Sequence, residues 1–322
     1  MQIVLCYPVA AKHIAQIQEI VPTATLIDAG QERVAEELLN ADVFCGHPKV
    51  AVPWDAVATC GRLRWIQSSA AGLDHCLVPS IIESDIIVTS ASGVLADQVA
   101  EHALGLAIAC TRRLPLFIAQ QKNKEFVRRP TGDLTGATVG IVGLGGVGRR
   151  LVEVLEPFRV RILATDYFPV HKPPAVAFLG GPDTLSMVLE QADILFLCVP
   201  LTARTKGMID ARRIAGMKQG AILVNVARGQ LVEEVALADA LHSGHLAAAA
   251  LDVTPAEPLP IESRLWTSPN ILITPHVAGQ SAHRIDAMTD FFCQNLSRYL
   301  LGTNLRNAVD KRLGFPEPQN LK

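Results

Sequence analysis

Short aliphatic runs alternate with amphipathic stretches along almost the whole chain, and this alternation constrains the fold more than any other feature. Aliphatic runs bounded by turn residues predict buried strands, and amphipathic intervals predict helices that cover both faces of a parallel sheet. The expected strands are residues 2–8, 24–29, 42–47, 64–69 and 86–92, and in a second series 137–143, 161–166, 193–199, 221–227, 246–253 and 270–275. The pattern predicts an α/β chain with two doubly wound parallel sheets, the second of which has the size that binds a nucleotide.

Three segments mark the expected domain boundaries. Residues 97–113 carry apolar residues all round, with no glycine or proline break apart from Gly105, and predict a buried helix that joins the two series. Residues 120–136 are polar and basic and predict a surface loop, whereas residues 281–301 predict one long helix. If that helix returns to the first series, the first domain is discontinuous. We therefore expect one domain from residues 1–100 and 285–322, and a second domain, residues 101–284, inserted in it.

Composition excludes several classes of function. The chain has 322 residues, of which 49% are hydrophobic and 19% charged, so it can bury two cores. Its net charge of -2 offers no basic surface for nucleic acid or an anionic membrane. The seven cysteines are scattered and lack a CxxC pair, which favours a reducing compartment. With no basic leader and no apolar run of about 20 residues, we expect a cytoplasmic protein that acts on a small molecule and binds neither nucleic acid nor membrane.

A glycine-rich turn follows the first strand of the second series. Gly143, Gly145 and Gly148 form a G-x-G-x-x-G pattern, with Gly146 and Val147 inside it, at the point where a strand gives way to a helix. The first glycine permits the tight turn, the second lets a pyrophosphate approach the backbone, and the third lets helix and strand pack closely. The N-terminus of the following helix offers N–H groups to the phosphates. These residues predict a dinucleotide site.

Asp166 favours NAD as the dinucleotide. It ends the next strand, eighteen residues after Gly148, where a carboxylate can accept hydrogen bonds from the adenosine ribose hydroxyls. A carboxylate at this position repels the 2'-phosphate of NADP, and the three residues that follow it include no arginine.

Three residues with suitable chemistry stand after later strands: Arg228, Glu257 and His276. Because the carboxyl ends of parallel strands form the ligand-binding edge of an open α/β sheet, we expect these side chains to lie together. Taken singly, they could be a surface cation, a loop carboxylate and a core histidine. Together, downstream of a dinucleotide site, they predict hydride transfer to and from a 2-oxo acid. The imidazole would protonate the oxygen, the carboxylate would stabilise the imidazolium, and the guanidinium would bind the substrate carboxylate in a bidentate manner.

Longer motifs carry a family resemblance over essentially the full length. They are SSAAGLDH (68–75), ADQVAEHALGL (96–106), LTGATVGIVGLGGVGRRL (134–151), CVPLTARTKGMID (198–210), VNVARGQLVEE (224–234), ALDVTPAEPLP (250–260) and NILITPHVAG (270–279). With these motifs the chain resembles the D-isomer-specific 2-hydroxyacid dehydrogenase family, which includes glyoxylate, hydroxypyruvate and phosphoglycerate dehydrogenases. The resemblance implies a Rossmann NAD-binding domain inserted in a flavodoxin-like substrate domain, and a homodimer formed through the nucleotide-binding domain.

The resemblance also implies roles for individual residues. The catalytic Arg, Glu and His of the family fall on Arg228, Glu257 and His276, and backbone N–H groups at Ala71 and Gly72 join Arg228 in binding the substrate carboxylate. Besides the glycine turn and Asp166, the implied cofactor contacts are Val199, Pro200, Thr205, Ala227, Asp252, His276 and Gly279. No metal is implied.

Several alternatives bear on the substrate and the class of function. Formate dehydrogenases of the family carry a glutamine at the position of Glu257, so the acid argues against that activity. A phosphorylated substrate needs cations near the first-domain strand ends, where few occur (Lys49, and Arg62 and Arg64). A small unphosphorylated acid such as glyoxylate or hydroxypyruvate is therefore favoured over phosphoglycerate.

Two alternatives of another kind stay open. Some relatives of the family are dinucleotide-sensing corepressors that keep the catalytic residues. A metal enzyme would depend on His242 and His245, which lack acidic or cysteine neighbours and are better interpreted as surface histidines.

Overall fold

The computed structural model describes residues 1–318, which fold into two compact units. One unit comprises Met1–Leu95 and the segment that begins at Ser281, and the other comprises Ala96–Gln280. The two units divide a few residues from the expected boundaries at 100 and 285, which fall within α5 (Ala96–Thr111) and α11 (Arg284–Leu300). A helix is one hydrogen-bonded element, so each boundary falls before its first residue.

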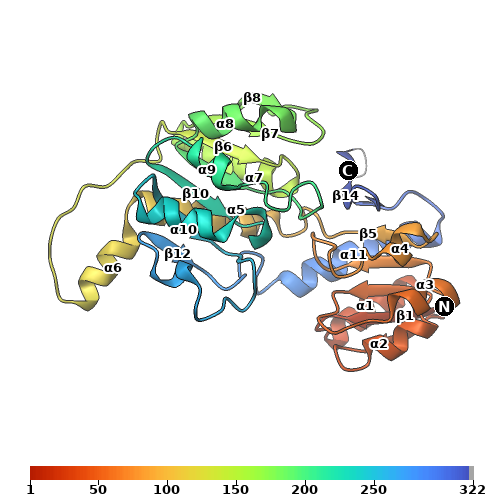
Figure 1. The fold of residues 1–322 in the computed structure, drawn as a ribbon. Helices are drawn as coiled ribbons and strands as arrows, with labels where there is room; N and C mark the ends of the chain where they lie inside the picture. The colour runs from red at the N-terminus through yellow and green to blue at the C-terminus, as the bar shows by residue number, and fades with distance from the viewer. Residues whose placement is uncertain (319–322) are drawn as a thin grey trace. The chain divides into compact units, whose positions relative to one another are not determined.

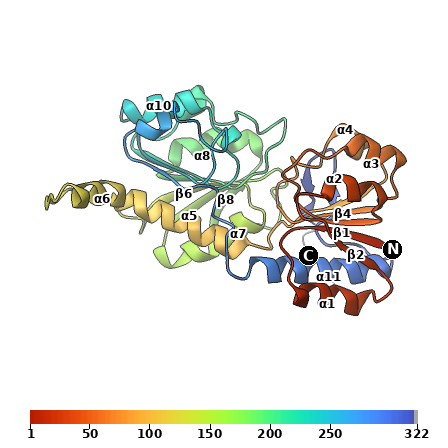
Figure 2. The same cartoon turned by 90° about the horizontal axis from the view of Figure 1, so that it is seen from below.

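The first unit contains a five-stranded parallel sheet in the order β2-β1-β3-β4-β5, the flavodoxin-like order. Its strands are β1 (Gln2–Cys6), β2 (Thr25–Asp28), β3 (Val43–Gly46), β4 (Trp65–Ser68) and β5 (Ile87–Thr89), and each lies within an expected run. Its helices are α1 (Ala11–Ile20), α2 (Val34–Glu37), α3 (Trp54–Cys60), α4 (Pro79–Glu83) and α11. Helices α1 and α11 cover one face of the sheet, and α2, α3 and α4 cover the other (Figure 2). The tail after α11 adds a small hairpin of β13 (Val309–Asp310) and β14 (Phe315–Pro316).

The second unit contains a seven-stranded parallel sheet in the order β12-β11-β10-β9-β6-β7-β8 (Figure 1). Renumbered from its own first strand, this is the Rossmann order with one further strand at the edge. The strands are β6 (Thr138–Val142), β7 (Arg161–Thr165), β8 (Val176–Gly180), β9 (Ile194–Leu197), β10 (Ala221–Asn225), β11 (Leu246–Leu251) and β12 (Ile271–Ile273). The helices are α5, α6 (Leu114–Lys122), α7 (Gly146–Leu155), α8 (Leu185–Gln191), α9 (Ala211–Ala215) and α10 (Glu234–His242). The predicted fold class, two doubly wound α/β domains, is confirmed.

Two local expectations in the second unit are wrong. Six strands were expected in this sheet, and the seventh, β8, was missed. Its short apolar run follows Pro173 and Pro174. Because β8 is an edge strand that pairs only with β7, it lacks the continuous burial of a central strand. The expected surface loop 120–136 begins with the last turn of α6, a helix with Pro115 in its first turn.

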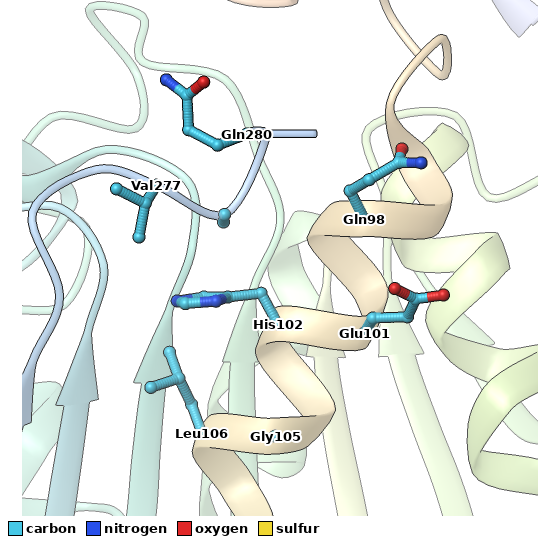
Figure 3. A pocket seen from close by; sticks show the side chains of 8 residues that line it. Gln98, Glu101, His102, Gly105, Leu106, Val277 and Gln280 are labelled. Carbon is cyan, nitrogen blue, oxygen red and sulfur yellow. The ribbon is translucent and has the colours of Figure 1, made fainter. Parts of the chain in front are cut away.

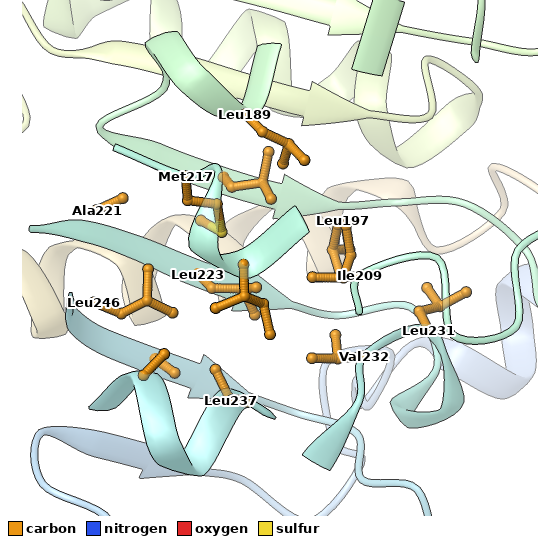
Figure 4. Close-up of a cluster of buried hydrophobic side chains, with 14 of the residues drawn as sticks. Leu189, Leu197, Ile209, Met217, Ala221, Leu223, Leu231, Val232, Leu237 and Leu246 are labelled. Carbon is orange, nitrogen blue, oxygen red and sulfur yellow. The ribbon is translucent and has the colours of Figure 1, made fainter. Parts of the chain in front are cut away.

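Helices cover both faces of the seven-stranded sheet. One buried cluster packs α8, α9 and α10 on one face, with leucines 189, 197, 223 and 237 at its centre (Figure 4). A second cluster packs α5 and α7 on the other face. A fully buried leucine stabilises the fold by roughly 1.5–3 kcal/mol, so two such clusters hold the strands rigidly and fix the strand ends that carry the site.

No single helix among the described residues is long and apolar enough to cross a membrane. Only α5 and α6 taken together pass on length and composition, and they are bent by 66° at the break between them.

Candidate active site

The three residues predicted for catalysis follow three neighbouring strands. Strand β10 pairs with β11, and β11 pairs with β12, all in parallel, so their carboxyl ends lie side by side. Arg228 follows β10, Glu257 lies in the loop after β11, and His276 follows β12. The structure thus brings the expected set to one edge of one sheet, as the parallel topology requires.

The loops that carry Arg228 and Glu257 are in backbone contact. A Cβ atom added to Gly229 would lie 1.9 Å from the carbonyl carbon of Thr254, so only glycine allows this approach. The Gln230 side chain donates a hydrogen bond to the Pro255 carbonyl at 2.9 Å and ties the two loops together. The glycine after the arginine is therefore required by packing.

His276 and Glu257 form a hydrogen-bonded pair. The His276 Nδ1 atom lies 2.7 Å from Glu257 Oε2, and the other carboxylate oxygen, Oε1, accepts the Thr254 N–H at 3.2 Å. With Nδ1–H donated to the carboxylate, Nε2 is the ring atom that can exchange a proton with a substrate. The two side chains are 47% and 40% exposed, so a ligand can reach them.

Asp252 organises the loop on which His276 sits. This carboxylate is 1% exposed, and it accepts the backbone N–H groups of Val277 and Ala278, both at 2.9 Å, and the Thr274 hydroxyl at 2.6 Å. The Asp252 carbonyl accepts the His276 N–H at 2.8 Å. His276 has a φ of 54°, an unfavourable backbone conformation for a non-glycine residue, which these bonds offset. Asp252 is thus a positioning residue, a role that its sequence motif alone did not indicate.

His102 extends this network from helix α5. Its Nε2 atom lies 2.9 Å from the Thr274 hydroxyl and 3.3 Å from Asp252 Oδ1. Figure 3 shows the His102 side chain pointing from α5 toward the chain at Val277, where a pocket of about 440 Å³ opens. Sequence reasoning missed His102 and Thr274, because a lone polar residue on an apolar helix gives no sign of its partner.

Arg228 is held by a buried asparagine at the end of β10. Asn225 is fully buried; its Nδ2 donates to the Arg228 carbonyl at 2.9 Å and its Oδ1 accepts the Ala227 N–H at 3.0 Å. The Arg228 guanidinium donates to the Ala227 carbonyl at 2.8 Å and stays half-buried. Ala227, expected beside the nicotinamide, is thereby fixed in the same turn.

The glycine turn has the geometry that a dinucleotide needs. Gly143 has a φ of 96°, and a Cβ atom on Gly148 would lie 2.1 Å from the Gly143 carbonyl oxygen, so both positions require glycine. No atom lies within 4 Å of a Cβ placed on Gly145, which leaves open space at the start of α7. The first-turn N–H groups of α7, which begins with Gly146 and Val147, have no intrahelical partners and can bind phosphate. The residues fit a dinucleotide.

Asp166 lies directly beside this turn. Its Oδ2 atom accepts the Leu144 N–H at 2.6 Å, and its Oδ1 atom accepts the Phe168 N–H at 2.9 Å. The carboxylate is therefore fixed at the end of β7, next to the glycine turn, as the sequence pattern predicts for a ribose-binding acid.

The loop after β9 lies across the glycine turn from β7. Thr205 donates to the Pro200 carbonyl at 2.7 Å and accepts the Thr202 N–H at 2.8 Å, so it braces the loop that holds Val199. Burial raises the pKa of the neighbouring Cys198 thiol to about 12. Gly279, the last expected contact, lies in the chain between Ala278 and Gln280, two residues that line the pocket of Figure 3.

Ala71 and Gly72 belong to the first unit, in the loop after β4. The Ser68 hydroxyl accepts the Ala70 N–H at 3.0 Å and fixes the start of this loop, and Ala71 is exposed. The ring of His75, at the end of the loop, stacks on His47 with a centroid distance of 3.9 Å. Neither histidine was expected to contact the other.

The residues proposed for a metal alternative have other partners. The His242 Nδ1 lies 2.8 Å from the Ala238 carbonyl, and His245 contacts Gln219 and the Ile214 carbonyl. Within residues 1–318, no group of three histidine, cysteine or acidic side chains has the arrangement of a metal site.

Known proteins are similar to this chain in sequence and in fold. Residues 104–278 match the family described as D-isomer specific 2-hydroxyacid dehydrogenase, NAD binding domain. A glyoxylate reductase of Thermofilum pendens is 35% identical over 78% of this chain and 76% of its own length. A D-3-phosphoglycerate dehydrogenase of Methanocaldococcus jannaschii is 30% identical over the full chain, which spans 63% of that longer relative.

A solved structure has the same fold throughout. The D-isomer specific 2-hydroxyacid dehydrogenase of Xanthobacter autotrophicus, in complex with NADPH and MES, superposes with a TM-score of 0.84 at 26% identity, covering 98% of this chain and 99% of its own. Three observations lead to the same family: the sequence match, the Rossmann strand order, and the strand edge that carries Arg228, Glu257 and His276. This chain belongs to the D-isomer-specific 2-hydroxyacid dehydrogenase family, oxidoreductases that act on a CH–OH group with a nicotinamide dinucleotide.

Proposed function

We propose that the protein interconverts a small, unphosphorylated D-2-hydroxy acid and its 2-oxo acid, such as glyoxylate or hydroxypyruvate, with NAD as the preferred dinucleotide. The observation that carries the proposal is the 2.7 Å pair of His276 and Glu257 at the strand edge that also carries Arg228. An imidazole held by a carboxylate is suited to donate a proton to a developing alkoxide.

The glycine turn and Asp166 would hold the dinucleotide, which when bound would supply the hydride for C2 of the 2-oxo acid. His276 Nε2 gives its proton to the C2 oxygen, and Glu257 orients the ring by accepting the hydrogen bond of Nδ1–H. The Arg228 guanidinium binds the substrate carboxylate, and the backbone N–H groups at Ala71 and Gly72 bind it as well. In the reverse direction His276 takes the hydroxyl proton back.

NAD is proposed as the cofactor because of Asp166. Its carboxylate, fixed beside the glycine turn, suits two ribose hydroxyls and opposes a 2'-phosphate. The remaining expected contacts, Val199, Pro200, Thr205, Ala227, Asp252 and Gly279, stay part of this proposal, since they line the carboxyl ends of the same sheet.

Steady-state kinetics with a panel of 2-oxo acids tests the proposed reaction. We expect NADH oxidation with glyoxylate, hydroxypyruvate or pyruvate, and weaker oxidation with 3-phosphohydroxypyruvate. An Arg228→Lys variant should lose at least about tenfold in kcat/KM, because a single ammonium cannot reproduce the two-pronged guanidinium contact. NADH binding without turnover of any acid would instead support a dinucleotide sensor and contradict the proposed enzyme.

We also propose that the protein is a cytoplasmic homodimer. Helix α6 extends beyond the sheet of its unit in both views, and it and the following segment expose Leu114, Ile118, Phe126 and Val127 (Figures 1 and 2). Exposed apolar side chains on one projecting segment favour a partner of the same kind. All seven cysteines are free, as in reducing compartments. Light scattering should give a dimer that Ile118→Glu dissociates, and a monomeric wild type would contradict the dimer.

A further inference from the structure

Arg204 and Tyr167 meet at the edge of the dinucleotide site, although they are far apart in sequence. Arg204 lies in the loop after β9, and Tyr167 directly follows Asp166 at the end of β7. The Arg204 Nη1 atom donates to the Tyr167 hydroxyl at 2.8 Å, and the guanidinium carbon lies 5.5 Å from the centre of the tyrosine ring. The loop after β9 thus places a cation beside the end of β7, where the three residues that follow Asp166 include none.

This contact borders the position of the adenosine ribose. In the sheet, β6 lies between β9 and β7, so the glycine turn after β6 is flanked by the two segments that carry Arg204 and Tyr167. Asp166 is fixed to the glycine turn through Leu144. Since the proposed function places the ribose hydroxyls on Asp166, the next residue and the guanidinium bound to it stand beside the 2' position.

The surroundings hold Arg204 in place and leave its charge available. Its loop is braced by the hydrogen bonds of Thr205 to Thr202 and Pro200. Among residues 1–318, the Arg204 side chain contacts Tyr167 and no carboxylate, and it is exposed. Both oxygens of Asp166 accept backbone N–H groups, whose dipoles offset part of the negative potential that a phosphate would meet.

A second arginine fixes the other end of the same segment. Arg149, in the first turn of α7, donates to the carbonyl oxygens of Val170 and His171 at 3.2 and 2.8 Å. The segment from Tyr167 to His171 is therefore pinned at both ends by guanidinium groups. This rigidity keeps the Tyr167 hydroxyl and Arg204 in a defined position beside Asp166.

We propose that Arg204, positioned by Tyr167, binds the 2'-phosphate of NADP(H), so that this NAD-preferring enzyme also accepts NADPH. A guanidinium and a phenol hydroxyl are both donors, and a guanidinium binds phosphate with two parallel hydrogen bonds. Asp166 sets the preference for NAD, and Arg204 sets how much NADP(H) is tolerated. The assignment rests on the proposed function for the place of the ribose.

Ligand binding tests the assignment without turnover. The probes are 2',5'-ADP, which carries the 2'-phosphate, and 5'-AMP, which lacks it, titrated by calorimetry against the wild type and Arg204→Gln. We expect the variant to lose at least about tenfold in affinity for 2',5'-ADP and less than twofold for 5'-AMP. Arg161→Gln is the matched control, because Arg161 lies at the amino-terminal end of β7, away from the dinucleotide site, and donates a hydrogen bond to Gln191. It should leave both affinities unchanged.

Kinetics and further variants separate the remaining explanations. With an accepted 2-oxo acid, Arg204→Gln should lower kcat/KM for NADPH about tenfold and leave NADH within twofold, and Tyr167→Phe should produce a smaller loss in the same direction. Equal losses for both probes would mean that Arg204 acts on the adenine, and no loss for either would mean that it does not touch the cofactor. Either result overturns the proposal. Absence of turnover with all acids would contradict the proposed function and leave the probe titrations as an independent test of Arg204.

Discussion

Replacing Asp252 by Asn tests whether the buried carboxylate holds the His276 loop. Asp252 accepts backbone N–H groups from Val277 and Ala278 through different oxygens. An asparagine has one oxygen, so whichever way it turns, its NH2 group faces one of these N–H donors. That backbone N–H group and the NH2 group of the asparagine are then two buried donors without acceptors.

The magnitude follows from those two donors. An unsatisfied buried polar group costs about 1–3 kcal/mol, so the variant should lose roughly 2–6 kcal/mol of its free energy of unfolding. A loop that relaxes to relieve the clash shifts His276 away from its position, and a displacement of about 1 Å can cost on the order of 100-fold in rate. We expect kcat to fall by about that factor.

Urea unfolding and steady-state kinetics measure the two effects, and NADH binding by fluorescence separates loop positioning from direct cofactor contact. Asp193→Asn is the matched control, because Asp193 accepts the Thr138 N–H at 2.8 Å at the opposite edge of the sheet. It should lower stability and leave kcat unchanged. If Asp252→Asn unfolds like the wild type and retains its kcat, the loop does not depend on this carboxylate. A large loss of NADH affinity with kcat unchanged would also refute the positioning role.

Three further predictions concern titratable groups. Glu257→Gln replaces the carboxylate that accepts the His276 Nδ1–H by an amide, so kcat for the reduction of a 2-oxo acid should fall by about tenfold or more, and an unchanged kcat would refute this role. Cys60 is the exposed thiol, and burial raises the pKa of the other six cysteines. Cys60 should therefore react first with iodoacetamide at pH 8, as followed by mass spectrometry. Rapid labelling of a second cysteine would contradict the burial of the other six. Hydrogen bonds from Lys12 and His13 lower the pKa of Asp286 to about 2, below its value in the unfolded chain. The stability lost in Asp286→Asn should therefore be fully present above pH 5 and vanish as pH falls toward 2, and a pH-independent difference would contradict the pairing.

The sequence by itself determined the features that depend on local pattern. Strand residues alternate with amphipathic helices over short distances, so eleven of the twelve strands of the two main sheets fall in expected runs, and β8 escapes because an edge strand needs no continuous apolar run. The glycine turn is also local: Gly143 and Gly148 are required by the backbone within six residues. Arg228, Glu257 and His276 were found because each follows a recognisable strand, and parallel strands end at one edge.

Only the tertiary structure decided which partners these residues have. Asp252 meets His102 from α5, more than a hundred residues away, and Arg204 meets Tyr167 because β9 and β7 flank the same central strand. From sequence, the absence of an arginine after Asp166 indicated only a preference for NAD; the fold supplies that arginine from another loop. A hydrogen bond between distant residues depends on strand order and side-chain direction, and a linear pattern contains neither.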